Sequence, residues 1–170
     1  MKKTLRLAIA LLAAAFSPLA SAGEQTFPAK NPVLKFNAPE KWVSEVDKKD
    51  GSLSVNSPDG RVSVNFGEVP VEASMDLFEK MLPDMVKVLT DATVAEKAKE
   101  HSEDGLTGYT ATYIGKIEDK PAMCIFILFK GGKDRAILGN VVVSDPSTLA
   151  KDVDEAIGSL MKSLKGADQK

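Results

Sequence analysis

This chain has few of the side chains that carry catalysis or hold metals: its 170 residues include one cysteine and one histidine. A single cysteine cannot close an intramolecular disulfide, and one cysteine with one histidine cannot supply the ligands of a structural zinc site. The charged fraction of 27% and a mean hydropathy of −0.09 exclude a disordered acidic chain and a polytopic membrane protein. The length suits one domain with, at most, a short tail.

The first 22 residues have the layout of a cleaved secretory signal. A basic start is followed by the apolar run 7–16 and by Ala20-Ser21-Ala22, whose small residues suit cleavage before Gly23. Ten apolar residues fall well short of the roughly 20 that span a bilayer, which argues against a membrane anchor. We therefore expect a signal peptide over residues 1–22, cleavage after Ala22, and a location in the bacterial periplasm. No cysteine follows this site directly, so we expect no lipid anchor.

The net charge of the chain argues against two classes of partner, nucleic acids and anionic lipids. Residues 1–22 carry three basic and no acidic side chains, so their removal would change the net charge from −2 to −5. Nucleic acids and anionic lipids need clustered lysine and arginine on their partners. We therefore expect neither nucleic acid nor a membrane surface as the partner.

Alternating apolar residues predict strands in the first half of the remaining chain. After an irregular leader over residues 23–32, we expect one domain from 33 to 166 and a frayed tail from 167 to 170. Strands are expected at 33–38 and 42–46. A hairpin should pair 53–55 with 62–66 through the turn Ser57-Pro58-Asp59-Gly60, which has proline at its second position and glycine at its fourth.

After Pro70 the apolar period lengthens to three and four residues. The apolar positions are Met75, Phe78, Met81, Leu82, Met85 and Leu89. This spacing predicts an amphipathic helix, which Pro83 should kink or split because proline lacks a backbone N–H. The methionines could line an adaptable binding groove, although core packing explains such a stripe equally and is commoner.

The second half alternates again before a final helix. We expect a charged edge strand at 93–102 and strands at 106–117, 122–129 and 136–143, of which 122–129 is apolar throughout and should be covered on both faces. Asp145 should be the N-cap of the last helix, with Pro146 at its first position and Gly166 at its end. The sequence thus predicts an α+β domain with a mostly antiparallel sheet of about seven strands and two main helices.

Neither residue with potential nucleophile or base chemistry has a visible partner. Cys124 lies within the apolar segment Met123–Phe129, where a thiol packs as a small hydrophobic side chain. His101 lies in the charged stretch 100–105, and no nucleophile motif exists for it to serve as a base. We therefore expect a buried thiol and a solvated imidazole.

Carboxylates cluster at Glu103-Asp104, at Glu118-Asp119 and in the stretch 152–155, but none has the spacing of a calcium loop. We interpret the first two as turns and the third as the exposed side of the last helix, with weak divalent binding left as an alternative. Gly131-Gly132-Lys133 is too short for a phosphate loop and precedes a strand. The sequence therefore predicts no catalytic, cofactor-binding or metal-binding residue, and no cofactor.

A family resemblance begins at Phe36, Pro39 and Trp42, which form an F-x-x-P-x-x-W pattern at the end of a strand. The later parts that agree with it are the Ser57–Gly60 hairpin, the helix from Ser74 to Asp91, the hairpin from Tyr109 to Phe129 and the helix after Asp145-Pro146. Over residues 33–165 the chain resembles the PsbP-like superfamily, and in particular the small bacterial periplasmic proteins of the DcrB type.

This resemblance implies an α/β/α sandwich around an antiparallel sheet and a non-enzymatic accessory role. Relatives include an extrinsic photosystem II subunit, a Ran-binding factor and envelope proteins linked to phage or colicin sensitivity. DcrB-type proteins usually look like lipoproteins, whereas Ala20–Gly23 offers no lipid-acceptor cysteine. The resemblance provides no catalytic residue, and the motif's Phe36, Pro39 and Trp42 are expected to serve packing.

The sequence and the resemblance lead to three hypotheses about the function of this protein. The leading hypothesis is a soluble, non-enzymatic periplasmic accessory protein that binds another envelope protein through one face of the sandwich. The second is a protein that binds a small ligand or, weakly, a divalent metal in a groove between a helix and the sheet. The third is a hydrolase or thiol enzyme, which the isolation of Cys124 and His101 disfavours.

Overall fold

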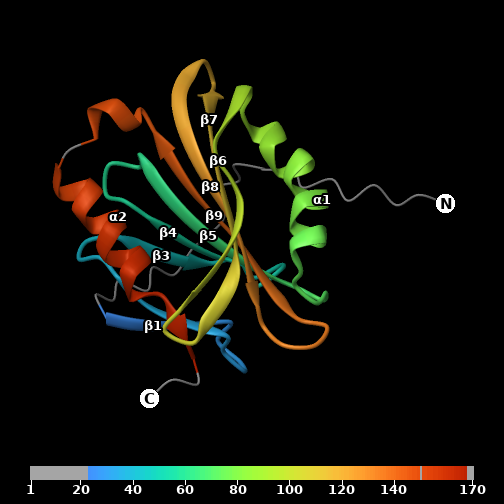
Figure 1. Ribbon diagram of the computed structural model, residues 1–170. Helices are drawn as coiled ribbons and strands as arrows, with labels where there is room; N and C mark the ends of the chain where they lie inside the picture. Colours follow the sequence, from blue (N-terminus) through green and yellow to red (C-terminus); the bar gives the residue numbers. More distant parts are fainter. Residues whose placement is uncertain (1–22, 150, 168–170) are drawn as a thin grey trace.

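A computed structural model of the chain describes residues 23–149 and 151–167. The expected signal peptide, residues 1–22, and residues 168–170 of the expected tail lie outside the described residues. In the described part, two helices and two antiparallel sheets form three layers (Figure 1). Helix α1 covers one face of the large sheet, and helix α2 with the small sheet lies over the other face.

The large sheet contains seven antiparallel strands in the order β3-β4-β5-β9-β8-β7-β6. Their bounds are β3 (Val43–Val46), β4 (Leu53–Asn56), β5 (Val62–Val69), β6 (Thr90–Glu103), β7 (Leu106–Ile117), β8 (Lys120–Lys130) and β9 (Ala136–Ser144). The small sheet, in the order β1-β2-β10, consists of β1 (Gly23–Phe27), β2 (Leu34–Ala38) and β10 (Lys165–Gly166). The helices are α1 (Met75–Met85) and α2 (Lys151–Ser163), with 3-10 turns η1 (Val86–Val88) and η2 (Pro146–Thr148). The predicted α+β class is confirmed, and the small sheet is an addition to it.

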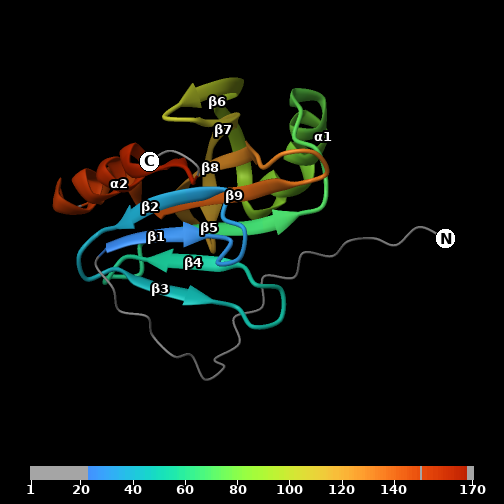
Figure 2. The same ribbon diagram turned by 90° about the horizontal axis from the view of Figure 1, so that it is seen from below.

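The expected irregular leader is wrong for residues 23–27, which form strand β1 along β2, whereas residues 28–32 contain no helix or strand, as expected. Their sequence lacks a clear apolar alternation, and only Phe27 among them is buried. The strand forms because β2 offers a free edge to pair with, which is a tertiary effect. Figure 2 shows the small sheet lying across the large one, and the Phe27 and Phe36 rings contact Phe66 of β5 there.

Strand β8 lies between the two hydrophobic cores. Cys124, Phe126 and Leu128 pack in the cluster that contains Phe78 of α1. Ile127 packs on the opposite face, in the cluster that contains Leu160 of α2. The expected burial of this strand on both faces is confirmed from Phe126 to Phe129, whereas Met123 and Ile125 are only partly buried.

Helix α1 is not split at Pro83, which was one of the two effects expected of this proline. Ser74 caps its start, because its Oγ accepts a hydrogen bond of 3.2 Å from the Leu77 N–H. The helix continues through Pro83 to Met85 and only then tightens into η1. Proline removes a single intrahelical hydrogen bond, and the burial of Phe78 and Leu82 offsets that loss.

The expected helix cap at Asp145 is wrong. Asp145 has a left-handed backbone (φ 49°), makes no capping bond with its side chain, and leads into η2 rather than α2. The Arg61 guanidinium instead holds this turn: it donates to the backbone oxygens of Asp145 (2.7 Å) and Thr148 (3.0 Å) and to Thr148 Oγ1 (2.7 Å). Arg61 lies 84 residues from Asp145 in the sequence, so a distant side chain helps to hold this turn.

The described part of the chain has a short strand after α2 rather than a helix C-cap at Gly166. Helix α2 stops at Ser163, and Lys165–Gly166 pairs with β2 as β10. The Ala167 N–H then donates to the Val33 oxygen at 3.0 Å. The expected fraying therefore does not begin at residue 167, because the edge of β2 holds this residue.

Replacing Arg61 with alanine should destabilise the protein by about 1–3 kcal/mol, because several backbone and hydroxyl acceptors of the η2 turn lose a charged donor. Urea unfolding followed by circular dichroism measures the change. The matched control is Arg135→Ala, which breaks a single ion pair with Glu68 and should cost less than about 1 kcal/mol. An equal cost for both variants would contradict the role assigned to Arg61.

Candidate functional site

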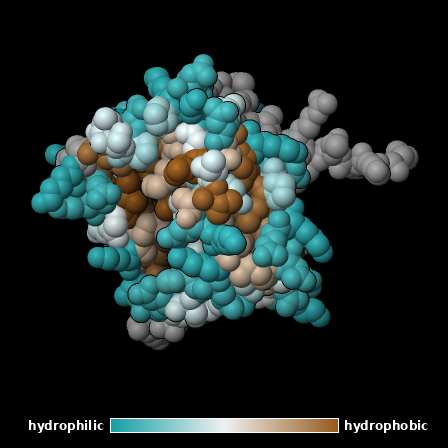
Figure 3. Space-filling view, turned by 45° about the horizontal axis from the view of Figure 1, so that its top comes forward, coloured by the Kyte–Doolittle hydropathy of each residue, from teal (hydrophilic) through white to brown (hydrophobic). Residues whose placement is uncertain are grey.

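The layers leave part of the large sheet uncovered on the α2 side. Helix α1 contacts β6 and β8 on one face, whereas the small sheet and α2 cover the inner strands on the other face. The outer strands β6 and β7 are therefore less covered on the α2 side, apart from Leu106 at the start of β7, which is buried in the α2-side cluster. Figure 3 shows apolar residues gathered on the molecular surface, with hydrophilic residues around them.

The strand register shows that the burial of side chains on the α2 side of the large sheet decreases from β9 to β7. Val143, Met123 and Ile114 are direct cross-strand partners on β9, β8 and β7, so their side chains share a face. Val143 is fully buried, Met123 is partly buried, and Ile114 is 46% exposed. We call the three residues Ile114, Met123 and Ile125 the open strip.

Helix α2 belongs to the same apolar surface. Of its apolar side chains, Leu160 is buried, whereas Val153 and Ile157 are only partly buried against the same cluster as Met123 and Ile125. An amphipathic helix normally buries its apolar stripe. The incomplete burial here extends the uncovered apolar area from the sheet onto α2.

The edge next to the open strip is unsuited to strand addition. Strand β6 carries charged side chains that pair locally, such as Glu96 with Lys99 (2.9 Å) and Glu100 with Lys130 of β8 (2.7 Å). Its pairing with β7 contains register shifts, which interrupt a regular ladder. Charges and bulges are the features by which edge strands avoid pairing with other chains. This confirms the expected charged edge strand, and it leaves the face of the sheet as the contact surface.

Cys124 and His101 lie on opposite faces of the large sheet. Cys124 is fully buried against the α1 cluster, and this burial raises the pKa of its thiol to about 11. The His101 side chain is 55% exposed on β6, and its Nε2 lies 3.1 Å from Glu103 Oε2. The expected burial of the thiol and exposure of the imidazole are confirmed. The two groups cannot act together, because the sheet separates them.

The carboxylates do not converge. Glu118 and Asp119 form the β7–β8 turn with left-handed backbones, and Asp104 lies in the β6–β7 turn. In residues 23–149 and 151–167, no three side chains of histidine, cysteine, aspartate or glutamate come together as metal ligands would. The side chain of Asp152 lies outside the described residues.

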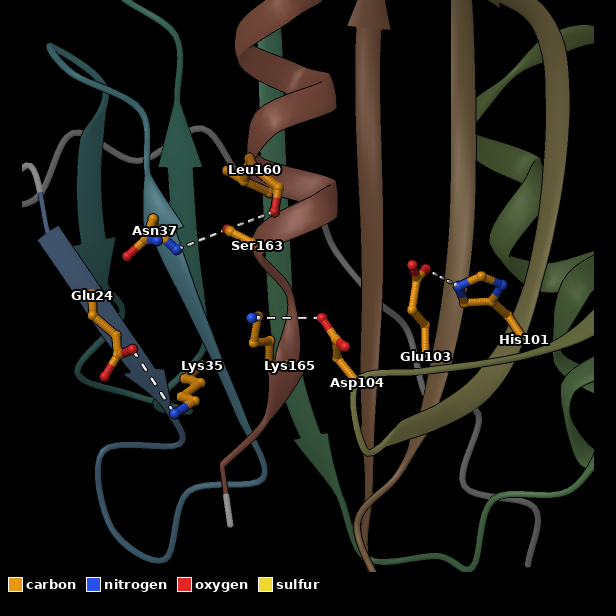
Figure 4. A network of polar contacts seen from close by, with 9 residues as sticks. All are labelled: Glu24, Lys35, Asn37, His101, Glu103, Asp104, Leu160, Ser163 and Lys165. Carbon is orange, nitrogen blue, oxygen red and sulfur yellow. Dashed lines mark hydrogen bonds and ion pairs between the residues drawn. The ribbon is translucent and has the colours of Figure 1, made fainter. Parts of the chain in front are cut away.

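A charged cleft, which the sequence did not indicate, lies where the two ends of the domain meet. Its volume is about 210 Å³, and Figure 4 shows most of its residues. They are Glu24, Lys35, Phe36, Asn37, Asp104, Ser163 and Lys165. These residues come from β1, β2, the β6–β7 turn, the end of α2 and β10. No sequence window contains them together, so only pairing of the terminal strands could reveal the cleft.

Together, these features define an α+β domain with two candidate contact surfaces, one apolar and one charged. No protein-family model matches the chain, and no curated protein matches it. The fold is similar to a crystal structure, at 1.50 Å resolution, from Bacteroides thetaiotaomicron VPI-5482, with a TM-score of 0.54 and 13% sequence identity. The similarity covers 86% of this chain and 48% of that one, so this chain spans about half the length of its neighbour.

The length and hydropathy of the two helices bear on whether either could cross a bilayer. In the part of the chain that the structure describes, neither α1 nor α2 is long and apolar enough to cross a membrane.

The Cys124 thiol should react with iodoacetamide at least about 100-fold more slowly in the native protein than in the unfolded chain at pH 8. A pKa raised from 9.0 to about 11 lowers the thiolate fraction about 100-fold, and burial adds steric protection. Mass spectrometry of the alkylated protein measures the rates, with guanidinium-unfolded protein as the control. Rapid labelling of the native protein would contradict the burial.

The raised pKa of Cys124 also predicts a pH dependence of stability. From pH 9 towards about 11 the unfolded chain releases the thiol proton while the native protein retains it, so the free energy of unfolding should fall in this window. The Cys124→Ala variant lacks this thiol and should lose less stability over the same pH range. Equal slopes of stability against pH in the two proteins would show that the thiol does not contribute.

Proposed function

We propose that this protein is a non-enzymatic accessory protein of the bacterial cell envelope. In this proposal, residues 1–22 export it to the periplasm, and the open strip binds another envelope protein. The single observation that carries the proposal is the incompletely covered apolar surface of Ile114, which is 46% exposed, and of Met123 and Ile125, which are partly buried. Exposed apolar surface with a polar surround is typical of protein-binding sites.

The composition of the outer strands supports a face-on contact. Thr110 and Thr112 of β7 lie next to the open strip and are partly buried, so they offer hydroxyl groups without charge. The charged side chains of β6 border this area and would form the polar rim of an interface. A partner could therefore bury an uncharged centre without desolvating an unpaired ion.

The separation of Cys124 from His101 supports a role without catalysis. A thiol or serine mechanism needs a nucleophile and a base within hydrogen-bond reach of each other. Here the only thiol is buried with a raised pKa, and the only imidazole contacts Glu103 on the opposite face.

We also propose that the chain is a PsbP-like protein of the DcrB type. The order of helices and strands and the packing of the F-x-x-P-x-x-W residues support this assignment. Phe36 is 1% exposed and Trp42 is 6% exposed, and both belong to the core on the α2 side. Their burial agrees with the packing role that the motif was expected to have.

The second candidate function is binding of a small ligand, and the charged cleft is the observation that favours it. It lies between the end of α2 and strand β2, which is the kind of groove expected for such a ligand.

Replacing Ile114 with aspartate should lower the recovery of a crosslinked envelope partner at least about tenfold, because a carboxylate would be desolvated at the centre of the contact. Affinity purification from crosslinked periplasm, followed by quantitative mass spectrometry, measures the recovery. Val46→Asp is the matched control, since Val46 has the same 46% exposure but lies on β3 at the opposite edge. No reproducible partner, or equal losses in both variants, would overturn the proposal.

A further inference from the structure

Three turns of the protein contain an aspartate followed by a glycine. In such a step the glycine nitrogen can attack the aspartate Cγ without an enzyme, because glycine has no side chain to hinder the approach. A cyclic imide forms and a carboxyl oxygen leaves as water. All six residues are exposed, so solvent access does not distinguish the steps, and only their hydrogen bonds can. The three steps are Asp50-Gly51, Asp59-Gly60 and Asp104-Gly105.

The Asp50-Gly51 step is held at both of its reacting groups. The Gly51 N–H, which carries the attacking nitrogen, donates to the Asp47 oxygen at 2.9 Å. The Asp50 carboxylate accepts a hydrogen bond of 2.9 Å from the Ser52 N–H, which lowers the pKa of this carboxyl. An ionised carboxylate is the poorer electrophile, because its oxygen must gain protons before it can leave as water. Both hydrogen bonds therefore oppose imide formation.

The Asp59-Gly60 step is held in the same way. The Gly60 N–H donates to the Ser57 oxygen at 2.9 Å. The Asp59 carboxylate accepts from Ser57 Oγ (2.6 Å) and from the Arg61 N–H (3.1 Å), and these bonds lower the pKa of its carboxyl. This step must therefore break at least two hydrogen bonds before its nitrogen and its Cγ can meet.

The Asp104-Gly105 step has neither restraint. These two residues alone connect β6 to β7, and both have positive φ (47° and 74°), as in a type I′ hairpin turn. The hydrogen bond that closes such a turn joins its flanking residues. Among residues 23–149 and 151–167, the Gly105 N–H finds no acceptor and the Asp104 carboxylate accepts no hydrogen bond. Its ion-pair partner, Lys165 Nζ, lies 3.6 Å away (Figure 4).

We propose that Asp104-Gly105 is a site of spontaneous covalent modification, at which aspartate converts to isoaspartate. A bond forms between the Gly105 nitrogen and the Asp104 Cγ, and one water leaves. One water then adds to the imide, and cleavage of the bond from the Asp104 carbonyl carbon to the nitrogen leaves isoaspartate. The sum is an isomerisation that needs no oxidant, reductant or cofactor. It involves no binding partner, so it does not rest on the proposed function.

The modification would act on strand β10. The Gly166 N–H donates to the Asp104 backbone oxygen at 3.1 Å, and the fit is close, because a Cβ at Gly166 would lie 2.7 Å from the Gly105 oxygen. Isoaspartate leads the main chain through Cβ, which lengthens the turn by one carbon and turns the accepting carbonyl into a carboxylate branch. Isomerisation should therefore loosen β10 from the β6–β7 turn.

Incubation of the secreted protein in ¹⁸O-labelled water at about pH 6 tests the proposal, because each passage through the imide introduces one solvent oxygen. Peptide mass spectrometry measures the label at the three steps, and fragmentation identifies isoaspartate. Asp104-Gly105 should gain label at least about tenfold faster than the other two, which must first break hydrogen bonds. Labelling there that is no faster than at either of the other steps would overturn the proposal.

The guanidinium-unfolded chain is the control for local sequence. Its turns are lost, so the three steps should gain label at comparable rates. If Asp104-Gly105 kept the same advantage in the unfolded chain, the assignment to the folded turn would be overturned.

The Asp104→Glu variant tests the route through the imide. Glutamate keeps the charge but would need a six-membered ring, so labelling at this step should fall at least about tenfold, with the other two steps unchanged. The chain accommodates glutamate with this backbone at Glu118 (φ 49°). Undiminished labelling would contradict the imide.

Hydrogen exchange followed by NMR measures the effect on β10. The Gly166 amide should exchange faster in incubated protein than in fresh protein, and this difference should be absent from Asp104→Glu. Equal exchange before and after isomerisation would contradict the loosening of β10.

Discussion

The burial of residues 126–129 of strand β8 on both faces of the sheet is the constraint on which the two hydrophobic cores depend. Cys124, Phe126 and Leu128 point towards α1, and Ile127 and Phe129 point towards the α2 side. Side chains alternate along a strand, so a shift by one residue would exchange the two sets. The antiparallel register with β7 and β9 therefore decides which face every neighbouring side chain occupies.

This register also explains why side chains of β7 and β8 are more exposed on the α2 side of the large sheet than on the α1 side. Cross-strand partners of a buried residue on β9 become progressively exposed on β8 and β7, because α2 and the small sheet cover mainly the inner strands and reach β7 only near Leu106. On the opposite face α1 covers the outer strands, with Phe78 near Tyr109. The open strip is thus a consequence of where the covering elements end, and of the apolar residues that β7 and β8 keep beyond that limit.

The small sheet joins the two ends of the described chain and creates the charged cleft. Strand β2 pairs with β1 from the beginning and with β10 from the end, which places Glu24, Lys35 and Lys165 together. The same pairing brings Gly166 against the β6–β7 turn and so adds Asp104. The charged cleft is therefore formed by segments more than 120 residues apart in the sequence.

The sequence by itself determined the elements whose signal is local: the Ser57–Gly60 turn, the apolar stripe of α1, the edge strand β6, and residues 126–129 of β8, which are buried on both faces. It also placed Cys124 in the core and His101 at the surface, since each is surrounded by neighbours of the same character. Only the tertiary structure decided that residues 23–27 form a strand and that Asp145 does not cap α2. It also decided that Lys165–Gly166 pairs with β2 and that the charged cleft forms. In each case the partner is a distant group, such as the edge of β2 or the Arg61 guanidinium, and hydrogen bonds to distant groups leave no periodicity in the sequence.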